Sequence, residues 1–520
     1  MASNHLNQRK VVCKSNDNFA RCKPKPSKLK NVLLECGQGT GSRTFTSSDA
    51  LPFQLAHINI DTRSLNKGEI LIKFSSIVNM ETLAAGATVR LKYELFRVCN
   101  SEGLKSLGAW DFEEIGVAPP VFDSQEESFS FIFCECKNLG KCCEYFVVVT
   151  PLEITNAIAT VSNGRMGSIA QSLDGPLNNE CEIYDFKYDC LKSEIKAPKP
   201  KEVILVCGQG NGNFTFRQAT ISQPPVTIAN VTIDTTCLYR PKVFIDFSSI
   251  INVDFRVLDV RLKFELFRVC RDEQPLSLGT WSFEREDTNL PLAVDKAFTF
   301  VFCEDIPCPG CCEYFVTVEG IELNVGPPSI YLGVTLGNAR ITAIAQSSRE
   351  GSYEEDRQKL DGKKDCDYCP LKSPKPKKIL LECGMGTGSR TFSSSNDSAF
   401  QLAHTTIDTT SLCKPIVNIE FSSIVSFERI EDDGIAELRY ELFRACDNRE
   451  PVSVGIWILG RVDFTLIDKS TNTFDFTFCD CVTCPGCCNY FVTVTPTQIT
   501  EGLITATVSN GRMAALAGEG

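Results

Sequence analysis

Histidine and tryptophan are scarce in this chain: each occurs 3 times in 520 residues, against 34 phenylalanines. The histidines are His5, His57 and His404. The last two occupy matching positions in two copies of an internal repeat, where the remaining copy has Asn230. A general base is not expected to disappear from one copy, so neither acid–base catalysis nor a Ser–His nucleophile is predicted. We therefore do not expect an enzyme.

A basic surplus and long apolar runs are also missing. The formal net charge is −12 and the isoelectric point is near 5.1. Binding to nucleic acid needs a basic surface, so nucleic acid is not an expected partner. Residues 1–13 lack the apolar segment of a secretory signal, and no stretch is long and apolar enough to span a membrane. We expect synthesis in the cytosol without membrane insertion.

Cysteine, in contrast, is abundant, with 27 residues, and it recurs in a pattern. The stretches 133–147, 302–316 and 478–492 share Phe-Cys at the start and Cys-Cys-x-Tyr-Phe-Val at the end. A fixed period indicates tandem copies of one fold, and the length fits about three domains. The expected organisation is an N-terminal arm at 1–30, repeats at 31–172, 201–347 and 377–520, and linkers at 173–200 and 348–376.

The positive charge gathers in runs of Lys and Pro that precede each repeat. These runs lie at 23–28, 196–201 and 372–378. Such composition is typical of extended, solvated and flexible spacers. The alternative is that they contact an acidic neighbouring subunit.

Alternation of apolar and charged residues predicts strands. Between Thr88 and Leu95 the two kinds alternate, as in an antiparallel strand with one buried face. At Leu95-Phe96 the alternation slips by one residue, which predicts a bulge. Each copy has about eight or nine such segments and no helical period. The expected fold is an all-β chain of three antiparallel β-sandwiches, with jelly-roll topology first and an immunoglobulin-like order second.

Two cysteine spacings resemble metal motifs. The stretch 303–311 has the spacing of three plant-type iron–sulfur ligands, and 484–487 looks like a zinc knuckle. The first copy has Leu139 at the middle position, no histidine lies nearby, and the next cysteine is too distant for a fourth ligand. No metal or other cofactor is predicted, although an electron-transfer or metal-storage protein stays open as an alternative.

Disulfides explain the cysteines of the repeats better. Adjacent cysteines on a strand point to opposite faces, so one of each Cys-Cys pair can form an internal bridge while the other faces a neighbouring loop or chain. The motif then predicts a β-hairpin whose base is cross-linked by a disulfide. The candidates are Cys36, Cys99, Cys134, Cys142, Cys143, Cys207, Cys270, Cys303, Cys308, Cys311, Cys312, Cys383, Cys446, Cys479, Cys484, Cys487 and Cys488.

Six further cysteines lie in the arm and the linkers. One hypothesis is that they bond to the next subunit and cross-link a polymer. Local bridges or free thiols are the alternative, because spacing does not fix connectivity. These residues are Cys13, Cys22, Cys181, Cys190, Cys366 and Cys369.

Four other recurring motifs are interpreted as structural. The glycine-rich stretch 37–41 leads into a strand at 43–46 rather than a helix, so a tight turn is expected and not a nucleotide loop. Asn-x-Arg recurs near the end of each copy and predicts a hairpin turn, with its Arg either solvated or paired to an acid of the next domain or subunit. The Asp residues are expected to form turns, and the Ser pairs have no consistent His partner. These residues are Asn163, Arg165, Asn338, Arg340, Asn510 and Arg512; Asp61, Asp234 and Asp408; and the pairs 75–76, 248–249 and 422–423.

Three longer motifs carry a family resemblance. They are Leu-Glu-Cys-Gly-x-Gly-Thr-Gly-Ser-Arg-Thr-Phe at 34–45 and 381–392, Tyr-Glu-Leu-Phe-Arg at 93–97 and 440–444, and Cys-Pro-Gly-Cys-Cys-x-Tyr-Phe-Val-Thr-Val at 308–318 and 484–494. Together they resemble a cysteine-rich domain of unknown function from clostridial spore-formers, similar to domains of spore-surface appendage and exosporium proteins. The resemblance implies synthesis in the mother-cell cytosol and exposure to oxidant once that cell lyses.

From these observations we expect a non-enzymatic structural protein that self-associates in a disulfide-reinforced layer or fibre on the spore surface. Other spore-surface proteins are further candidate partners. The alternative is an adhesin-like module that binds a glycan or host ligand through its loops.

Overall fold

The computed structural model is all-β in the residues it describes. Among them, no helix has the length and apolar character needed to cross a membrane. The described residues are 31–62, 65, 68–99, 103–117, 124–137, 142–172, 202–217, 224–236, 238, 240–254, 257–270, 273–286, 294–306, 309–325, 333–347, 377–412, 415–431, 434–447, 449–462, 469–481 and 486–519.

The same succession of strands occurs in each repeat. The first repeat has β1 (Val32–Cys36), β2 (Gln38–Gly39), β3 (Arg43–Phe45), β4 (Phe53–Asp61), β5 (Gly68–Thr82), β6 (Ala87–Cys99), β7 (Lys105–Val117), β8 (Ser124–Lys137), β9 (Cys142–Thr155) and β10 (Ala157–Ser172). The second has β11 (Ile204–Cys207), β12 (Gln209–Gly210), β13 (Phe214–Arg217), β14 (Val226–Asp234), β15 (Pro241–Val253), β16 (Val257–Cys270), β17 (Leu276–Glu286), β18 (Val294–Asp305), β19 (Cys311–Val325) and β20 (Gly333–Ser347). The third has β21 (Leu380–Cys383), β22 (Met385–Gly386), β23 (Arg390–Phe392), β24 (Phe400–Asp408), β25 (Pro415–Arg429), β26 (Ile435–Cys446), β27 (Val452–Val462), β28 (Lys469–Cys481), β29 (Cys487–Ile499) and β30 (Ile504–Glu519).

Each repeat is a two-layer antiparallel sandwich, which confirms the predicted fold class. In the first repeat one layer has the order β1-β10-β5-β8, which we call the inner sheet, and the other has β2-β4-β9-β6-β7, the outer sheet. The second and third repeats have the same two layers. One apolar cluster fills the space between the layers in each sandwich.

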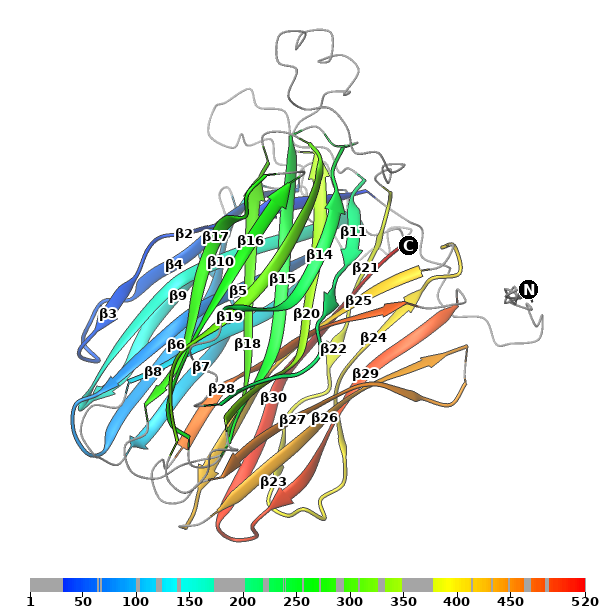
Figure 1. Cartoon of the computed structure of the whole chain (residues 1–520). Helices are drawn as coiled ribbons and strands as arrows, with labels where there is room; N and C mark the ends of the chain where they lie inside the picture. Colours follow the sequence, from blue (N-terminus) through cyan, green and yellow to red (C-terminus); the bar gives the residue numbers. More distant parts are fainter. Residues whose placement is uncertain are drawn as a thin grey trace, which may run out of the picture.

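The sheets do not end at the repeat boundaries. The inner sheet of the first repeat continues through β8 and β17 into the outer sheet of the second, the second joins the third through β18 and β27, and the third joins the first through β28 and β7. Three composite ten-stranded sheets result, and they close a cycle within one chain (Figure 1). The repeats are therefore packed together in a pseudo-three-fold ring, whose axis runs between the three inner sheets.

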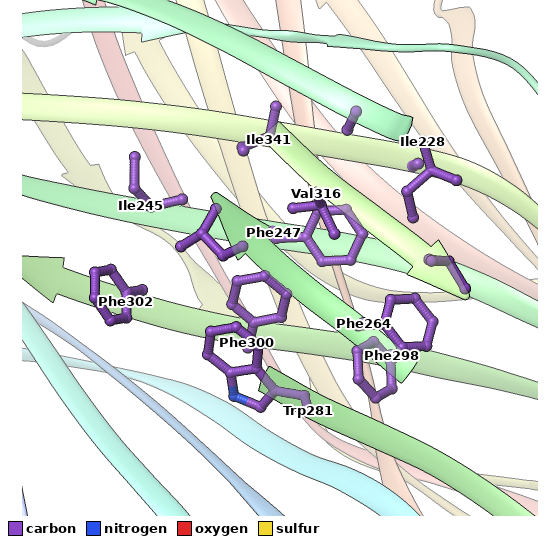
Figure 2. Close-up of a cluster of buried hydrophobic side chains, with 14 of the residues drawn as sticks. Ile228, Ile245, Phe247, Phe264, Trp281, Phe298, Phe300, Phe302, Val316 and Ile341 are labelled. Atoms are coloured by element: carbon purple, nitrogen blue, oxygen red, sulfur yellow. The ribbon is translucent and has the colours of Figure 1, made fainter. Parts of the chain in front are cut away.

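Aromatic side chains build the sandwich interiors in the same way three times. In the second repeat Trp281 stacks on Phe300 with ring centroids 3.8 Å apart, and Phe264 stacks on Phe298 at 3.9 Å (Figure 2). Trp110 on Phe131 and Trp457 on Phe476, both at 3.7 Å, repeat the first contact. The scarce tryptophans are thus one core residue per sandwich.

The bulge predicted at Leu95-Phe96 is present, because the register between β6 and β7 shifts there, but the alternation of β6 itself does not slip. Burial alternates without a break from Val89 to Cys99, so Phe96 faces outward and Arg97 inward. The bulge lies in the partner strand β7, where Leu107 is the extra residue between the pairs formed by Leu95 and Phe96. The sequence misleads here because Phe96 stacks on Phe146 outside, while Arg97 is paired with Glu135 inside.

The cysteine motif is not the predicted pinned hairpin. β8 pairs with β5 in the inner sheet, whereas β9 pairs with β4 and β6 in the outer sheet. The chain therefore crosses between layers at this point, so the cysteine before the crossing and those after it lie in different sheets and do not bridge the two strands to each other.

The Asn-x-Arg motif is likewise not a hairpin turn. Asn163, Asn338 and Asn510 each have φ of 53°, inside β10, β20 and β30 respectively. In β10 the pairing register with β5 shifts between Ser162 and Arg165. The left-handed conformation, which Asn tolerates well, thus forms a bulge in a continuous strand.

Candidate inter-repeat interface

A hydrophobic cluster separate from the sandwich interiors lies where the three inner sheets meet. Its members come from all three repeats, so it holds the ring together and not any single domain. The cluster contains Val32, Leu34, Leu71, Ile132, Ile169, Val203, Leu205, Phe244, Val301, Ile344, Ile379, Leu381, Ala514 and Leu516.

Three serines at one position of the inner strands join neighbouring repeats. Each hydroxyl oxygen accepts a backbone N–H from the next repeat, so the bonds follow the cycle of the ring. They run from Val301 N–H to Ser75 Oγ (3.0 Å), from Thr477 N–H to Ser248 Oγ (3.0 Å), and from Ile132 N–H to Ser422 Oγ (3.2 Å). β8, β18 and β28 pair with β17, β27 and β7 of the neighbouring repeats over only one to three residues. The serine hydroxyls add further hydrogen bonds between the same repeats.

Disulfides also join the repeats in a cycle. In each, the cysteine that ends the first strand of one repeat bonds to the Phe-Cys cysteine of its neighbour. The bridges are Cys36–Cys303, Cys207–Cys479 and Cys383–Cys134, with Cα atoms 5.8, 6.0 and 6.0 Å apart. These connections run between repeats but within one chain.

A second set of disulfides lies inside the repeats. Each joins the ends of adjacent outer strands, through Cys99–Cys143, Cys270–Cys312 and Cys446–Cys488, with Cα atoms 4.1, 4.1 and 3.9 Å apart. The buried member of each Cys-Cys pair forms the bridge, while Cys142, Cys311 and Cys487 are half-exposed.

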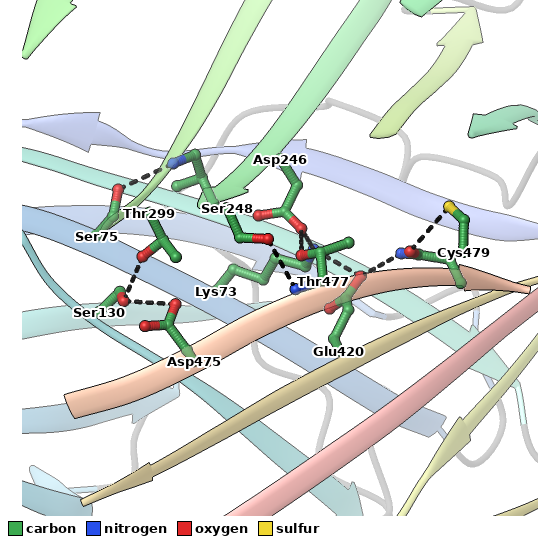
Figure 3. Close-up of polar contacts among 12 residues, drawn as sticks. Lys73, Ser75, Ser130, Asp246, Ser248, Thr299, Glu420, Asp475, Thr477 and Cys479 are labelled. Carbon is green, nitrogen blue, oxygen red and sulfur yellow. Dashed lines mark hydrogen bonds and ion pairs between the residues drawn. The ribbon is translucent and has the colours of Figure 1, made fainter. Parts of the chain in front are cut away.

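A buried row of charges crosses the axis at the next position along the inner strands. The Lys73 ammonium lies 3.0 Å from Asp246 Oδ2 and 2.6 Å from Glu420 Oε1 (Figure 3). The three residues occupy equivalent positions in Ile-Lys-Phe-Ser-Ser, Ile-Asp-Phe-Ser-Ser and Ile-Glu-Phe-Ser-Ser. Each repeat therefore contributes a different residue at one structural position.

Burial and charge act against each other in this row. Burial lowers the pKa of the Lys73 ammonium, but Asp246 and Glu420 outweigh it and the pKa is raised. Burial raises the pKa of Glu420 to about 7, although Lys73 acts to lower it, and the nearby Asp246 carboxylate raises it further. Glu420 Oε1 also accepts a bond from the Asn418 amide at 2.9 Å, while Oε2 is buried without a hydrogen-bond partner among the described residues.

A second row consists of Ser130, Thr299 and Asp475, again at equivalent positions. Ser130 Oγ lies 2.7 Å from Thr299 Oγ1 and donates to Asp475 Oδ2 at 2.7 Å (Figure 3). Burial raises the pKa of Asp475 to about 6. Residues of this row and of the charged row together line a cavity of about 20 Å³.

The third row is formed by Glu127, Lys296 and Asn472. The Lys296 ammonium lies 2.8 Å from Glu127 Oε1, and the Asn472 amide donates to Glu127 Oε2. All three rows thus combine side chains of different chemistry from the three repeats.

Each sandwich also encloses a pair of an arginine and an acid with a tyrosine. Tyr314 Oη donates to Glu304 Oε1 at 2.7 Å, and Arg268 Nη1 lies 2.6 Å from Glu304 Oε2. Arg97, Glu135 and Tyr145, and likewise Arg444, Asp480 and Tyr490, repeat the arrangement. Burial, and then the neighbouring carboxylate, raises the pKa of each tyrosine. A buried hydrogen-bonded unit of this kind fixes the packing between the two layers.

Two arginines of the Asn-x-Arg motif contact the next repeat, but through aromatic rings, whereas Arg340 Nη1 donates to Ala339 O at 3.1 Å. The guanidinium of Arg165 lies 5.7 Å from the centroid of Phe302, and that of Arg512 lies 5.7 Å from the centroid of Phe133. The predicted turn at Asp234 is present, since its Oδ1 accepts the N–H of Thr236 at 2.9 Å.

Several predicted site residues lie outside the described residues. These are Cys308, Cys484 and the arm and linker cysteines Cys13, Cys22, Cys181, Cys190, Cys366 and Cys369. Within the described part of the chain, no group of three or more His, Cys, Asp and Glu side chains is arranged to hold a metal ion.

The axial rows were missed by the sequence analysis, although a signal was present. Lys73 stands inside the otherwise apolar run Ile70–Phe74, and Ser75-Ser76 recurs in every copy on a strand buried on both faces. A charged residue inside such a run implies a buried partner. The partner was not identifiable, because it lies in another repeat.

Comparison with known proteins identifies the repeats. The chain belongs to a family defined by a domain of unknown function (DUF4489), whose model matches residues 30–171, 201–346 and 377–518. No match was found among curated proteins.

Three solved structures are similar in part. A CBM22-1-CBM22-2 tandem domain from Paenibacillus barcinonensis Xyn10C has 9% identity and a TM-score of 0.17, covering 61% of this chain and 99% of its own. The PBSX exported protein XepA has 11% identity and a TM-score of 0.12, covering 64% and 100%. A putative secreted protein from Parabacteroides distasonis has 9% identity and a TM-score of 0.15, covering 61% and 90%. At these scores the likenesses carry no argument about function.

Proposed function

We propose that this protein is a non-enzymatic structural subunit that self-assembles into a disulfide-reinforced layer or appendage fibre on the spore surface. The observation that carries the proposal is the covalent cycle of Cys36–Cys303, Cys207–Cys479 and Cys383–Cys134. It closes each chain into a ring that is covalently joined between every pair of repeats, which would help a structural subunit to resist unfolding.

The arrangement also separates two sets of cysteines. The bridges described above use cysteines of the sandwiches, whereas the arm and linker cysteines are assigned by the proposal to bonds between chains. Each bond forms when two thiols release two protons and two electrons to an oxidant such as molecular oxygen or oxidised glutathione. Synthesis without oxidant followed by exposure after lysis lets folding precede cross-linking.

Non-reducing electrophoresis and electron microscopy test the proposal on the full-length protein. We expect filaments or sheets after oxidation, a ladder of covalent multimers, and their loss with reductant. The matched control replaces Cys13, Cys22, Cys181, Cys190, Cys366 and Cys369 with serine, which should leave a folded monomer. Monomer from the oxidised native chain would contradict the assembly role. Immunogold labelling of intact spores tests the location.

A groove on the outer sheet of the second repeat favours a glycan-binding module as the second candidate. Phe267 and Phe315 stack with centroids 5.3 Å apart beside Lys263 and Glu265, around a space of about 230 Å³. Apolar rings next to charged hydrogen-bonding groups suit a sugar. Glycan-array binding by monodisperse protein, lost in Phe267→Ala, would favour this function over assembly.

A further inference from the structure

The contacts shared by all three joints do not tell the repeats apart. The serine bonds and the disulfides between repeats have the same geometry and the same residue types at every joint. A ring built from three copies of one repeat could form each of them. Whatever selects the partners of a repeat must therefore lie where the repeats differ, and the buried differences gather at the axis.

The charged row excludes rings of identical repeats. Three first repeats would bring three Lys73 ammonium groups together, and three second or third repeats would bring three carboxylates together. Like charges this close and this buried cannot all be ionised, and no partner would offset their desolvation. The observed row has Lys73 between Asp246 and Glu420, 3.0 and 2.6 Å away.

In every axial row the residue of the first repeat contacts both others. Lys73 does so in the charged row, Ser130 in the hydroxyl row and Glu127 in the third row. In the charged row this contact supplies the ammonium that pairs with both Asp246 and Glu420. The charged row therefore requires the first repeat in each ring, and once only.

Shape adds to this selection. Phe244 of the second repeat packs against Gly167 of the first, where a Cβ would lie 2.1 Å from Phe244 Cε2. The second repeat has Thr342 at the position of Gly167. Phe244 therefore fits the first repeat and has no room in a ring of second repeats.

We propose that these axial residues are an identity code: each ring accepts one copy of each repeat, and the matching repeat of a second copy of this chain can fill a place. This deepens the proposed function and rests on it, because it supplies a way for chains to join one another. The linker 173–200 has 28 residues and spans up to about 90 Å when extended, enough to place the first repeat in a neighbouring ring. Exchange of a repeat then turns two bridges of each ring into bonds between chains.

Two full-length variants with opposite defects test the code. Lys73→Glu leaves three acids at the axis, and the double variant Asp246→Lys/Glu420→Lys leaves three lysines. Neither can close a balanced ring alone. If they exchange their first repeats, one ring regains the native row and the other holds one glutamate with two lysines, so both rings are balanced.

The variants are made in the background where the six arm and linker cysteines are serine, so the bonds of the proposed function are absent. One variant is labelled with ¹⁵N, and the two are mixed in the reduced state. Glutathione disulfide is then added as the oxidant, and each new bridge releases two molecules of reduced glutathione. We expect a covalent dimer of twice 57.5 kDa, at least ten-fold more abundant than from either variant alone. Mixed-isotope peptides should join Cys36 to Cys303 and Cys134 to Cys383.

The matched control is Lys73→Glu/Glu420→Lys in one chain, which permutes the row without changing its composition and should close as a monomer. The proposal is overturned if the mixture yields no more dimer than the separate variants, if Lys73→Glu closes normally alone, or if the permuted chain fails to close. None of these results depends on whether the native chain polymerises through its arm and linkers. Failure of the code and failure of the proposed function are therefore distinguishable.

Discussion

β5, β15 and β25 each have two buried faces, and the two faces differ in how strictly the repeats agree. Toward the sandwich interior all three carry Phe, for example Phe74 in β5, and the same aromatic stack surrounds it. Toward the axis they carry Lys73, Asp246 and Glu420. The interior specifies one fold three times, while the axis specifies which repeat occupies which place.

The largest expected effect comes from the interior. Trp281→Ala removes the indole that stacks on Phe300 and should cost about 3–5 kcal/mol of unfolding free energy, because the cavity collapses only partly. Denaturant unfolding measures it. If the interiors are equivalent, Trp110→Ala and Trp457→Ala cost the same within error; unequal losses would break the comparison.

Removing one partner at the axis should come next. Lys73→Met leaves two buried carboxylates unbalanced and should cost about 3 kcal/mol. The control is the triple variant Lys73→Met/Asp246→Leu/Glu420→Met, which should be close to neutral because no buried charge remains. A triple variant as unstable as the single one would show that packing, and not charge, sets the effect.

The disulfides should also differ between the two regions. Cys36–Cys303 closes a loop with a sequence separation of 267, against 44 for Cys99–Cys143. Loop entropy predicts that Cys36→Ser/Cys303→Ser costs more than Cys99→Ser/Cys143→Ser, by about 1–2 kcal/mol. Thermal unfolding under oxidising conditions compares them, and equal losses would contradict this ranking.

The pH dependence sharpens the contrast without any change in packing. The pKa of Glu420 is raised from 4.5 to about 7, and that of Asp475 from 3.8 to about 6, in both cases by burial. A carboxyl with a raised pKa stabilises the fold while protonated, and this stability is lost as the pH rises through the folded value. We expect Tm to fall as the pH rises from about 4 to about 7, the range between the unfolded and the folded pKa values, and to fall less in Glu420→Gln. An unchanged slope in that variant would rule out the axis as the source.

The smallest effect is expected at the edge of the interface. Arg165→Ala loses the guanidinium above Phe302 and should cost about 0.5–1 kcal/mol. Arg165→Lys keeps the charge and tests whether the planar group matters. A loss above 2 kcal/mol in Arg165→Ala would mean that this contact belongs with the axial rows.

The fold class was predictable because its signals are local. Apolar alternation marked strands such as β6, and the recurring Cys-Cys-x-Tyr-Phe motif marked the repeats. The composite sheets were not predictable. At one joint Gln125 pairs with Arg285, 160 positions later, through backbone hydrogen bonds that any two strands can form. Neither stretch has a residue pattern that predicts the other as its partner.

The interface was only partly visible for the same reason. Lys73, Asp246 and Glu420 are each an anomaly in an apolar strand, but nothing in the three stretches shows that the three side chains meet. Equally, Cys36 and Cys303 are each recognisable as bridge candidates, while their connection crosses a repeat boundary.

The closing joint of the ring has a consequence for how the chain is made. β7, in the first repeat, pairs with β28, in the third, with Glu113 opposite Thr471. During synthesis the first repeat therefore waits with an open sheet edge, a surface prone to aggregation, until residues more than 350 positions later have left the ribosome. At elongation rates of about 5–20 residues per second this wait lasts on the order of tens of seconds. We expect nascent chains truncated before β28 to bind chaperones that recognise exposed strands.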